Sequence, residues 1–573
     1  MPRTRPVPAP RCRSRAAMGR EMRAHRSRWR AALACLGVTM TLGWSGGAAL
    51  GVESGVSLSV RDPAASLLAP GAGERTLHFA AAPAPGAGTR LSVRLHDYLA
   101  NGEPNPATLA STQAPLAGAG ATSGVGEATV RLQLPGIGFY LLDARLLAPD
   151  GTVIARRRIN LAAIPPRSVL GPPDFGVGAT FDHGPYAPNV LLSIIRNAGF
   201  SWIRGEVPWT EVEKRPGVFR FPAQFGNALD LASRMGIKSL VLLDYGNAHA
   251  YPSLFKGDNA FPMTAAAREK FVQYAAAVVK RYGAQVDDWE IWNEPHFKEI
   301  GYHAYVALLK DVYPVIKRLA PSSGVVSCGG DWGGNPVDAC IDAIIKQGAL
   351  NDQDGFSIHP YMFPAAPEVG YAGVGVPVAP VNITTVWPYL GRLIARNPRS
   401  NGQPLQLWVS EIGWPSAPRS PGQNTVTQAA YLLRTYLLSR RYGVARGVFW
   451  YDLVDNGTNP DDKESNFGLL RADLSPKPAF AAAAVLASTL ERRAWRAALV
   501  DTPQTKVFEY GTSEPVIAGW TVAGERVVHL RLPAGAYVER DWDGRQQPVA
   551  ETNGQIDWKL GPLPRYLLPA PTH

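Results

Sequence analysis

The sequence of 573 residues contains only four cysteines, and two of them fall in its N-terminal 51 residues. Cys12 and Cys35 lie in that segment, which leaves Cys328 and Cys340 in the rest of the chain. No spacing of cysteine and histidine resembles a zinc site. Cys328 and Cys340 either form one disulfide, as exported proteins allow, or remain two buried thiols, and the sequence leaves both possibilities open.

Glycine-rich loops that bind phosphate are also missing. The pairs Gly329-Gly330 and Gly333-Gly334 flank Asp331 and Trp332, but no lysine follows them as a phosphate-binding loop requires. The chain also contains no internal repeat and no long low-complexity tract.

Excess positive charge is scarce outside the N-terminus, although the formal net charge of the chain is +11. Residues 1–30 contain ten arginines and one glutamate, which account for +9 and leave +2 for everything that follows. So small an excess of positive charge does not produce an electrostatic field that would attract polyanions in general. A nucleic-acid or membrane-surface binder, which only the basic charge suggests, is therefore excluded.

Apolar runs long enough to cross a membrane are absent after residue 51. Before it, residues 31–51 are apolar, follow a basic segment and contain small residues near Gly46 and Gly47. These features predict a cleaved secretory signal in residues 1–51, and hence a secreted or periplasmic protein without stable membrane insertion. A transmembrane anchor is the alternative, and Ser45, Gly46 and Gly47 interrupt the run that such an anchor needs.

Residues 52–168 show short runs with period-two alternation, separated by clusters of glycine, proline and alanine. The clearest runs are 56–60, 91–95 and 128–132. Such alternation is typical of half-buried strands, and it predicts an accessory β-sandwich domain. The stretch 164–167, which contains two prolines, is predicted to be a stiff linker.

From Phe175 the pattern changes to alternating strands and helices, within a predicted domain of residues 172–492. Thr264 is a good cap for one of these helices. The predicted strands are 175–181, 201–206, 238–245, 286–293, 323–329, 354–361, 405–411 and 446–452. The predicted helices include 187–197, 221–235, 264–282, 424–441 and 478–492. Eight such alternations predict an α/β fold, a (β/α)₈ barrel whose active site lies at the C-terminal ends of the strands.

Residues 493–573 return to short strands, near 506–510, 526–532 and 565–568. This segment predicts a small β domain. The fold expected for the whole chain is therefore a (β/α)₈ barrel flanked by N-terminal and C-terminal β-sandwich domains.

Two of the predicted barrel strands end in a glutamate. Glu294 follows the run Asp287 to Asn293 and precedes Pro295, which cannot donate to a continuing sheet ladder. Glu411 ends the apolar run Leu405 to Ser410. Paired carboxylates at the ends of barrel strands indicate chemistry on glycosidic bonds.

The run Trp292-Asn293-Glu294-Pro295, with a later glutamate at a strand end, resembles the retaining glycoside hydrolases of clan A. Within the clan the chain most resembles glycoside hydrolase family 39 and its exopolysaccharide-cleaving relatives, over roughly its middle 300 residues. The resemblance implies that Glu294 is the acid/base and Glu411 the nucleophile. Retention requires their carboxyl groups to lie about 5–5.5 Å apart.

The resemblance also implies roles for five neighbours. Asn293 is expected to bind the sugar 2-OH, and Arg204 to hold the nucleophile ionised, unless it only pairs with Glu290. His359 is expected to contact a carboxylate or the sugar, and Tyr361 to donate to the nucleophile. Trp450 is expected to place its ring under the bound sugar, although a ring that fills the core is the alternative.

Further polar residues fall at predicted strand ends and could line sugar subsites, as any strand-end loop in a barrel could. They are Asp182, His183, Asp244, Tyr245, Asn247, Asp331, Trp332, Asp452 and Asp455. Asn382 begins a formal glycosylation sequon.

The function predicted from these observations is a secreted retaining β-glycoside hydrolase that cleaves a polysaccharide, in particular a bacterial exopolysaccharide. The alternatives are an exo-acting hydrolase like β-xylosidases or cellulases, and a barrel that binds carbohydrate without cleaving it. A hydrolase of this kind needs no cofactor, since acid and nucleophile both come from the protein. The sequence leaves the glycan, the choice between internal and terminal cleavage, and the oligomeric state open.

Overall fold

The computed structural model describes residues 55–120, 124–181, 185–295, 297–331, 337–373, 378–417 and 424–570. All of these belong to one compact unit, Gly46–His573. The predicted signal in residues 1–51 and the subsite candidates Asp182, His183 and Trp332 lie outside the described residues.

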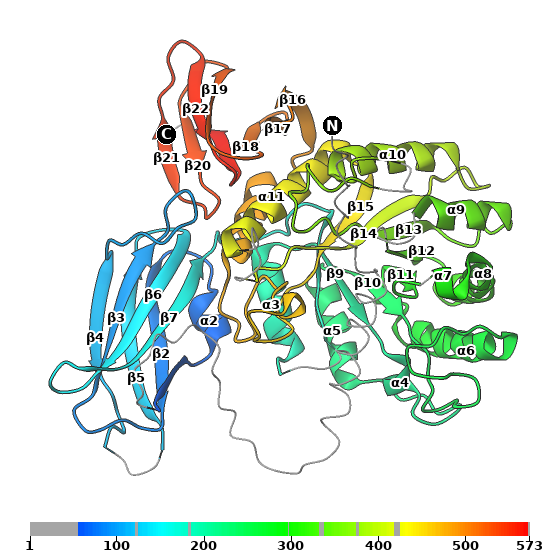
Figure 1. Cartoon of the computed structure of the whole chain (residues 1–573), viewed down its shortest axis with the longest axis horizontal. Coiled ribbons are helices and arrows are strands. Elements are labelled where there is room, and N and C mark those ends of the chain that lie inside the picture. Colours follow the sequence, from blue (N-terminus) through cyan, green and yellow to red (C-terminus); the bar gives the residue numbers. More distant parts are fainter. Residues whose placement is uncertain are drawn as a thin grey trace, which may run out of the picture. The chain divides into compact units, whose positions relative to one another are not determined.

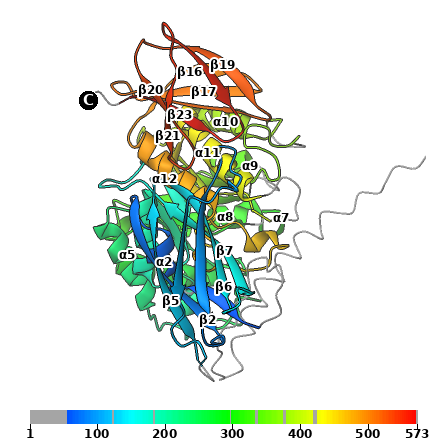
Figure 2. The same ribbon diagram turned by 90° about the vertical axis from the view of Figure 1, so that its left-hand side faces the viewer.

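Two antiparallel sheets form the N-terminal domain. One has the order β1 (Ser57–Val60), β2 (Gly73–Ala82), β5 (Gly126–Leu134), and the other the order β4 (Ala110–Pro115), β3 (Arg90–Asp97), β6 (Gly138–Leu147), β7 (Val153–Ala163). Figure 2 labels β2 and β5 of the first sheet and β6 and β7 of the second. A short helix, α2 (Pro63–Leu67), joins β1 to β2. Every second residue of β5 is buried, as expected for a strand with one face on a core. The predicted β-sandwich is confirmed.

Eight parallel strands close into a barrel, in the order β10-β11-β12-β13-β14-β15-β8-β9. They are β8 (Phe175–Gly178), β9 (Trp202–Glu206), β10 (Lys238–Leu243), β11 (Asp288–Ile291), β12 (Gly324–Asp331), β13 (Gly355–His359), β14 (Gln406–Ile412) and β15 (Ala445–Trp450). The predicted (β/α)₈ barrel is confirmed, and each predicted strand overlaps one of these.

Helices follow the strands and pack outside them (Figure 1). They are α3 (Pro188–Ala198), α4 (Trp209–Val212), α5 (Ala223–Arg234), α6 (Ala265–Tyr282), α7 (Phe297–Ile300), α8 (Tyr302–Leu319), α9 (Val337–Lys346), α10 (Ile383–Arg396), α11 (Thr425–Tyr442) and α12 (Pro478–Leu490), with a 3₁₀ turn η1 (Lys463–Ser465). The side chain of Thr264 accepts from the N–H of Ala267, so it caps α6 as predicted. Asn382 caps α10 in the same way and is buried, so its side chain serves the helix rather than the surface.

An apolar plug fills the lower part of the barrel. It consists of Trp202, Leu240, Val326, Trp408 and Phe449, one residue from each of five strands, all at most 1% exposed. Along β9, the residue two positions after Trp202 points to the same side of the strand. The plug therefore forms a dry floor under the side chains that follow it towards the C-terminal ends of the strands.

The C-terminal domain has a six-stranded and a two-stranded antiparallel sheet. The order of the first is β16 (Trp495–Asp501), β17 (Thr505–Tyr510), β18 (Val516–Thr521), β23 (Arg565–Pro569), β20 (Tyr537–Arg540), β21 (Gln546–Val549), and the second pairs β19 (Arg526–Arg531) with β22 (Gln555–Leu560). Asp543 of this domain accepts a hydrogen bond of 3.2 Å from the N–H of Phe139 in the N-terminal domain.

The segment between β15 and α12 is held by the N-terminal domain. Arg157 Nη2 lies 2.5 Å from Asp473 Oδ2, and Asn160 Nδ2 donates to the carbonyl of Pro476 at 3.1 Å. This segment begins at the C-terminal end of a barrel strand, where the predicted site lies. The accessory domain therefore fixes the part of this segment that leads into α12.

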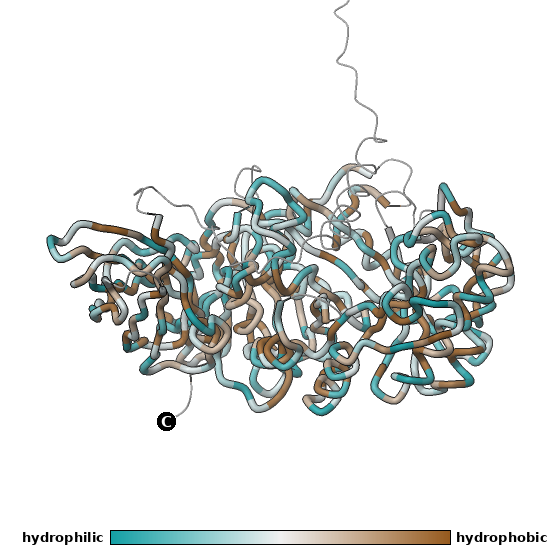
Figure 3. Tube along the Cα trace, turned by 90° about the horizontal axis from the view of Figure 1, so that it is seen from below, coloured by the Kyte–Doolittle hydropathy of each residue, from teal (hydrophilic) through white to brown (hydrophobic). Residues whose placement is uncertain are grey.

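A disulfide joins Cys328 on β12 to Cys340 on α9, which decides between the two possibilities that the sequence left open. Within the described residues, no helix has both the length and the apolar character to cross a membrane. In Figure 3, hydrophobic stretches of the trace are short and alternate with hydrophilic ones.

Candidate active site

Glu294 and Glu411 meet at the mouth of the barrel. Glu411 belongs to β14, whereas Glu294 lies three residues beyond the end of β11. A carboxylate oxygen of Glu294, one of Glu411 and a ring nitrogen of His359 all lie within 4.8 Å of one another. Nearest atoms this close are compatible with the spacing of about 5–5.5 Å between the carboxyl groups of retaining glycosidases.

Two donors hold Glu411. Arg204 Nη1 lies 2.7 Å from Oε1, and the hydroxyl of Tyr361 donates to Oε2 at 2.7 Å. Burial and the nearby charge of Glu411 raise the pKa of Tyr361 well above its usual value, so the hydroxyl keeps its proton and donates. Both contacts favour the ionised form of Glu411, which a nucleophile needs.

Arg204 spreads its guanidinium over three acceptors. Besides Glu411, its Nε lies 2.7 Å from Glu290 and its Nη2 donates to Asn293 Oδ1 at 2.8 Å. Burial by itself would lower the pKa of Arg204, but Glu290 and Glu411 outweigh burial and raise it. The sequence left two partners open, Glu411 or Glu290, and Arg204 binds both.

Glu290 is a third carboxylate, fully buried below the pair. In addition to Arg204, it accepts from Ser357 Oγ at 2.6 Å and Ser410 Oγ at 2.8 Å. Sequence reasoning treated Glu290 only as a possible partner of Arg204 and missed both serines. The signal that could have found them is the period-two alternation of β13 and β14, which places Ser357 on the side of His359.

Glu294 projects from an irregular turn. Trp292 and Glu294 have positive φ angles of 68° and 44°, so the predicted strand, drawn as far as residue 293, ends at Ile291 instead. The N–H of Glu294 donates to the carbonyl of Gly329 at 2.7 Å. At Gly329, φ is 36° and an added Cβ would lie 2.2 Å from the carbonyl oxygen of Trp292. Only glycine fits this close approach.

The carbonyl that holds Glu294 belongs to an irregular part of β12. The register of β12 against β13 shifts between Ser327 and Gly330. Within this bulge, the N–H of Cys328 donates to the hydroxyl of Tyr305 at 2.7 Å, and Cys328 is disulfide-bonded to α9. The bulge is therefore tied from two sides directly behind Glu294.

His359 lies between the two carboxylates. Its Nδ1 is 3.0 Å from Glu294 Oε1 and 3.6 Å from Glu411 Oε2, and its Nε2 is 2.9 Å from Ser410 Oγ. Burial tends to lower the pKa of His359, but Glu411 and Glu294 outweigh it and raise the pKa. The imidazole thus contacts the carboxylates, one of the two roles that the resemblance implied.

Asn293 is mostly buried beside the pair. Its Oδ1 accepts from Arg204, and its Nδ2 donates to the hydroxyl of Tyr245 at 3.0 Å. Tyr245 is one of the polar residues expected at strand ends, and this contact brings it into the site. Arg204 therefore orients the amide that the resemblance assigns to the sugar 2-OH.

Trp450 does not face the mouth, so the expectation of a sugar platform is wrong. Its side chain is 0% exposed and stacks on Trp414 at a centroid distance of 5.9 Å. The ring fills the core because Trp450 points outwards from the barrel, opposite to Phe449 in the plug. Tyr451, the next residue, is partly exposed, and its ring lies 6.5 Å from that of Tyr361.

Most of the other subsite candidates are buried and have structural contacts instead of facing the mouth. Asn247 is fully buried and donates to the carbonyl of Glu213. Asp455 pairs with Lys477 at 2.6 Å in the core, and Asp244 is 0% exposed. Asp452 is also mostly buried, and burial raises its pKa to about 8. The side chain of Asp331 lies outside the described residues.

Glu294, His359 and Glu411 also have donor atoms close enough to surround a cation. Arg204 and Tyr361 already engage the two oxygens of Glu411, and a guanidinium 2.7 Å away would repel a metal ion. These contacts therefore fit proton transfer and nucleophilic attack, the roles that the resemblance implies, better than they fit a metal site. No cofactor is needed for either step.

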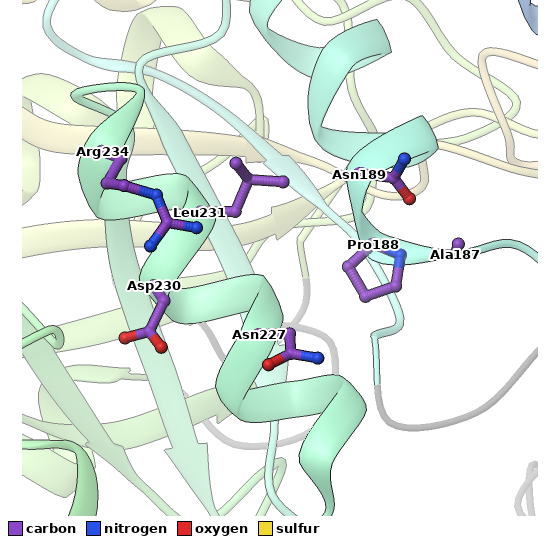
Figure 4. Close-up of a pocket in the computed structure, with 7 residues that line it drawn as sticks. All are labelled: Ala187, Pro188, Asn189, Asn227, Asp230, Leu231 and Arg234. Atoms are coloured by element: carbon purple, nitrogen blue, oxygen red, sulfur yellow. The ribbon is translucent and has the colours of Figure 1, made fainter.

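A separate surface hollow lies outside the barrel, between α3 and α5 (Figure 4). Its lining residues are Ala187, Pro188, Asn189, Asn227, Asp230, Leu231 and Arg234. None of them contributes to the carboxylate pair.

The chain is similar to the solved structure of a family 39 glycoside hydrolase from the gut symbiont Bacteroides cellulosilyticus WH2. The two are 36% identical, the match covers 87% of this chain and 97% of that chain, and the TM-score is 0.75. Two further solved structures are only remotely similar. A family 39 glycoside hydrolase from Xanthomonas axonopodis pv. citri is 16% identical, with 69% of this chain and 94% of that chain covered and a TM-score of 0.47. A family 30 endoxylanase from Clostridium papyrosolvens C71 is 14% identical, with 70% of this chain and 97% of that chain covered and a TM-score of 0.45. No protein-family model and no curated protein matches the chain.

Proposed function

Because the chain belongs to glycoside hydrolase family 39, we propose that it cleaves β-glycosidic bonds by double displacement, with Glu411 as nucleophile and Glu294 as acid/base. The observation that carries this proposal is the separation of the two carboxylates, whose nearest functional atoms lie within 4.8 Å. Nearest atoms this close are compatible with the spacing of about 5–5.5 Å at which one carboxylate can attack the sugar directly.

In the first step, Glu411 attacks the anomeric carbon while Glu294 gives its proton to the departing glycosidic oxygen. The bond between that oxygen and the anomeric carbon breaks, and an ester between Glu411 and the sugar forms. In the second step, Glu294 takes a proton from water, whose oxygen attacks the same carbon and releases Glu411. The two inversions restore the original configuration.

The different exposures of the two glutamates support this division of roles. The side chain of Glu294 is 35% exposed, as an acid that must reach a leaving group and then a water requires. The side chain of Glu411 is 13% exposed and is held by Arg204 and Tyr361, so its charge and position are set before substrate binds.

We propose that the substrate is a polysaccharide outside the cytoplasm, in particular a bacterial exopolysaccharide. The basic and apolar leader in residues 1–51 and the disulfide between Cys328 and Cys340 support export. Within the described residues, the large hydrophobic side chains that are exposed include no aromatic ring. In the C-terminal β domain the rings of Trp495 and Tyr537 are half-buried.

The test is a release assay on a panel of polysaccharides that includes bacterial exopolysaccharides. The wild type is expected to release oligosaccharides, and the newly formed ends should appear first as the β-anomer in NMR spectra. Glu411→Gln, which keeps the shape of the side chain, should release none. Initial formation of the α-anomer would contradict retention, and equal activity in the Gln variant would contradict the site.

A further inference from the structure

Two buried serines donate to the same oxygen of Glu290, but only one of them also contacts the imidazole of His359. Ser357 on β13 and Ser410 on β14 lie 2.6 Å and 2.8 Å from Glu290 Oε1. Ser410 Oγ is in addition 2.9 Å from His359 Nε2. All four residues are at most 2% exposed, so no solvent competes for these bonds.

The direction of each hydrogen bond in this chain follows from the groups present. Glu290 is paired with Arg204 Nε at 2.7 Å, and an ionised carboxylate only accepts hydrogen bonds. The single hydrogen of the Ser410 hydroxyl must therefore point to Glu290. The oxygen of Ser410 is left to accept, so the hydrogen on the imidazole is at Nε2 of His359.

A neutral imidazole carries a hydrogen on only one of its nitrogens. With that hydrogen at Nε2, the nitrogen that faces Glu294 at 3.0 Å has a lone pair. A carboxylate oxygen and a lone pair repel each other at this distance, whereas one proton between them makes a hydrogen bond. The Glu294–His359 pair therefore retains one proton, either on the carboxyl group or on the imidazole.

We propose that Ser410 and Glu290 are positioning residues that fix the tautomer of His359 and so keep on the Glu294–His359 pair the proton that glycosidic cleavage requires. The inference rests on the proposed function, because it concerns the acid of that mechanism. It assigns this role to Ser410 and not to Ser357, although both serines donate to Glu290.

The charged and titratable groups around His359 fit this role. Glu294 after β11, Glu411 on β14 and Arg204 on β9 face the imidazole, and Tyr361 follows it on its own segment. Asp331 of β12 is opposite His359 in register, with its side chain outside the described residues. The two glutamates outweigh burial and raise the pKa of His359, which favours retention of the shared proton.

The experiment compares Ser410→Ala with the matched control Ser357→Ala. Without Ser410, Nε2 has no acceptor, so neutral His359 can place its hydrogen on Nδ1 and donate to ionised Glu294. That arrangement stabilises the deprotonated pair, so the alkaline limb of the kcat/KM profile should move down by about one pH unit, the value of one hydrogen bond. Ser357→Ala should leave this limb in place, and Ser410→Thr, which keeps the hydroxyl, should restore it.

The leaving group separates a loss of acid from damage to the neighbouring Glu411. At alkaline pH, Ser410→Ala should slow cleavage of a β-linked oligosaccharide about tenfold and leave an activated aryl β-glycoside nearly unaffected, because a good leaving group needs little protonation. Equal losses on both substrates, or equal pH profiles for the two alanine variants, would overturn the proposal.

A second readout does not depend on activity. In protein labelled with ¹⁵N-histidine, the His359 signal, identified by its absence in His359→Gln, should show the neutral ring protonated at Nε2 in the wild type. A neutral ring that carries its single hydrogen at Nδ1 would overturn the proposal. Failure of the wild type on every glycoside would count against the proposed function instead, and the tautomer would still decide this inference.

Discussion

Glu294 and Glu411 occupy two different kinds of structure at the same mouth. Glu411 lies on a barrel strand and is held by two side-chain donors, Arg204 and Tyr361. Glu294 lies in a turn with positive φ, its backbone is held by the carbonyl of Gly329, and its side chain contacts His359. A nucleophile has to be charged and fixed, whereas an acid/base has to exchange a proton. The different supports match these different demands.

The largest expected effect is that of Glu411→Ala. Removal of the nucleophile should lower kcat by roughly 10⁴-fold or more, even on an aryl glycoside, and no burst of phenol should appear. Added azide can attack only from the opposite face and should give an α-glycosyl azide. Product analysis by NMR checks this outcome, and a β-azide would show that the two roles are reversed.

Glu294→Ala should produce the opposite pattern. With an aryl glycoside the glycosyl-enzyme should still form quickly, so a burst of phenol is expected, followed by turnover slowed by roughly 10²–10⁴-fold. Azide needs no base and should restore the rate with a β-glycosyl azide as product. Stopped-flow detection of phenol, with and without azide, measures both phases. Wild-type turnover in this variant would refute the site.

Arg204→Ala should lower turnover by roughly 10²–10³-fold and change the Michaelis constant little, because it removes the cation next to Glu411. It also leaves Glu290 buried without its ion pair, which should cost about 3–5 kcal/mol of stability. Arg204→Lys is the control, since it keeps the charge but cannot reach three acceptors at once. Steady-state kinetics and denaturant unfolding measure the two effects, and unchanged turnover in the alanine variant would contradict the role.

The disulfide should matter for Glu294 more than for Glu411. The double variant Cys328→Ser and Cys340→Ser removes a tie on the bulge that carries the carbonyl of Gly329. We expect a loss of about 2–3 kcal/mol in stability and a rate loss of about tenfold on oligosaccharides, with little loss on aryl glycosides. Thermal unfolding and the two substrates test this. Equal rate losses on both substrates would show that the disulfide does not act through Glu294.

The last prediction concerns the pH dependence of stability rather than catalysis, and it concerns Asp452 near Glu411. Burial raises the pKa of Asp452 to about 8, while the unfolded chain has a value near 4. The native state therefore binds the proton more tightly, so the wild type loses stability as pH rises from about 4 to about 8. Asp452→Asn removes this loss while its amide oxygen still accepts from the N–H of Leu453. Its Tm should match the wild type near pH 4 and exceed it at pH 8; equal values at both would contradict the burial effect.

Much of the site could be predicted, because it is encoded in short local patterns. The run around Glu294 and the apolar strand before Glu411 each identify a strand end, and a barrel brings strand ends together. The error at Trp450 has a local cause as well. Whether the last residue of β15 points inwards or outwards depends on a single position of register, and Tyr451 has the partly exposed ring.

The sequence by itself determined the succession of strands and helices and the two glutamates, since periodicity, caps and prolines act over a few residues. Only the tertiary structure decided which inward side chains meet. Arg204 binds carboxylates 86 and 207 positions away in the chain, and Ser410 rather than Ser357 reaches His359. These pairings depend on barrel closure and on register shifts in β12 and β14, which are set by packing across the whole barrel and leave no signature in any short stretch of sequence.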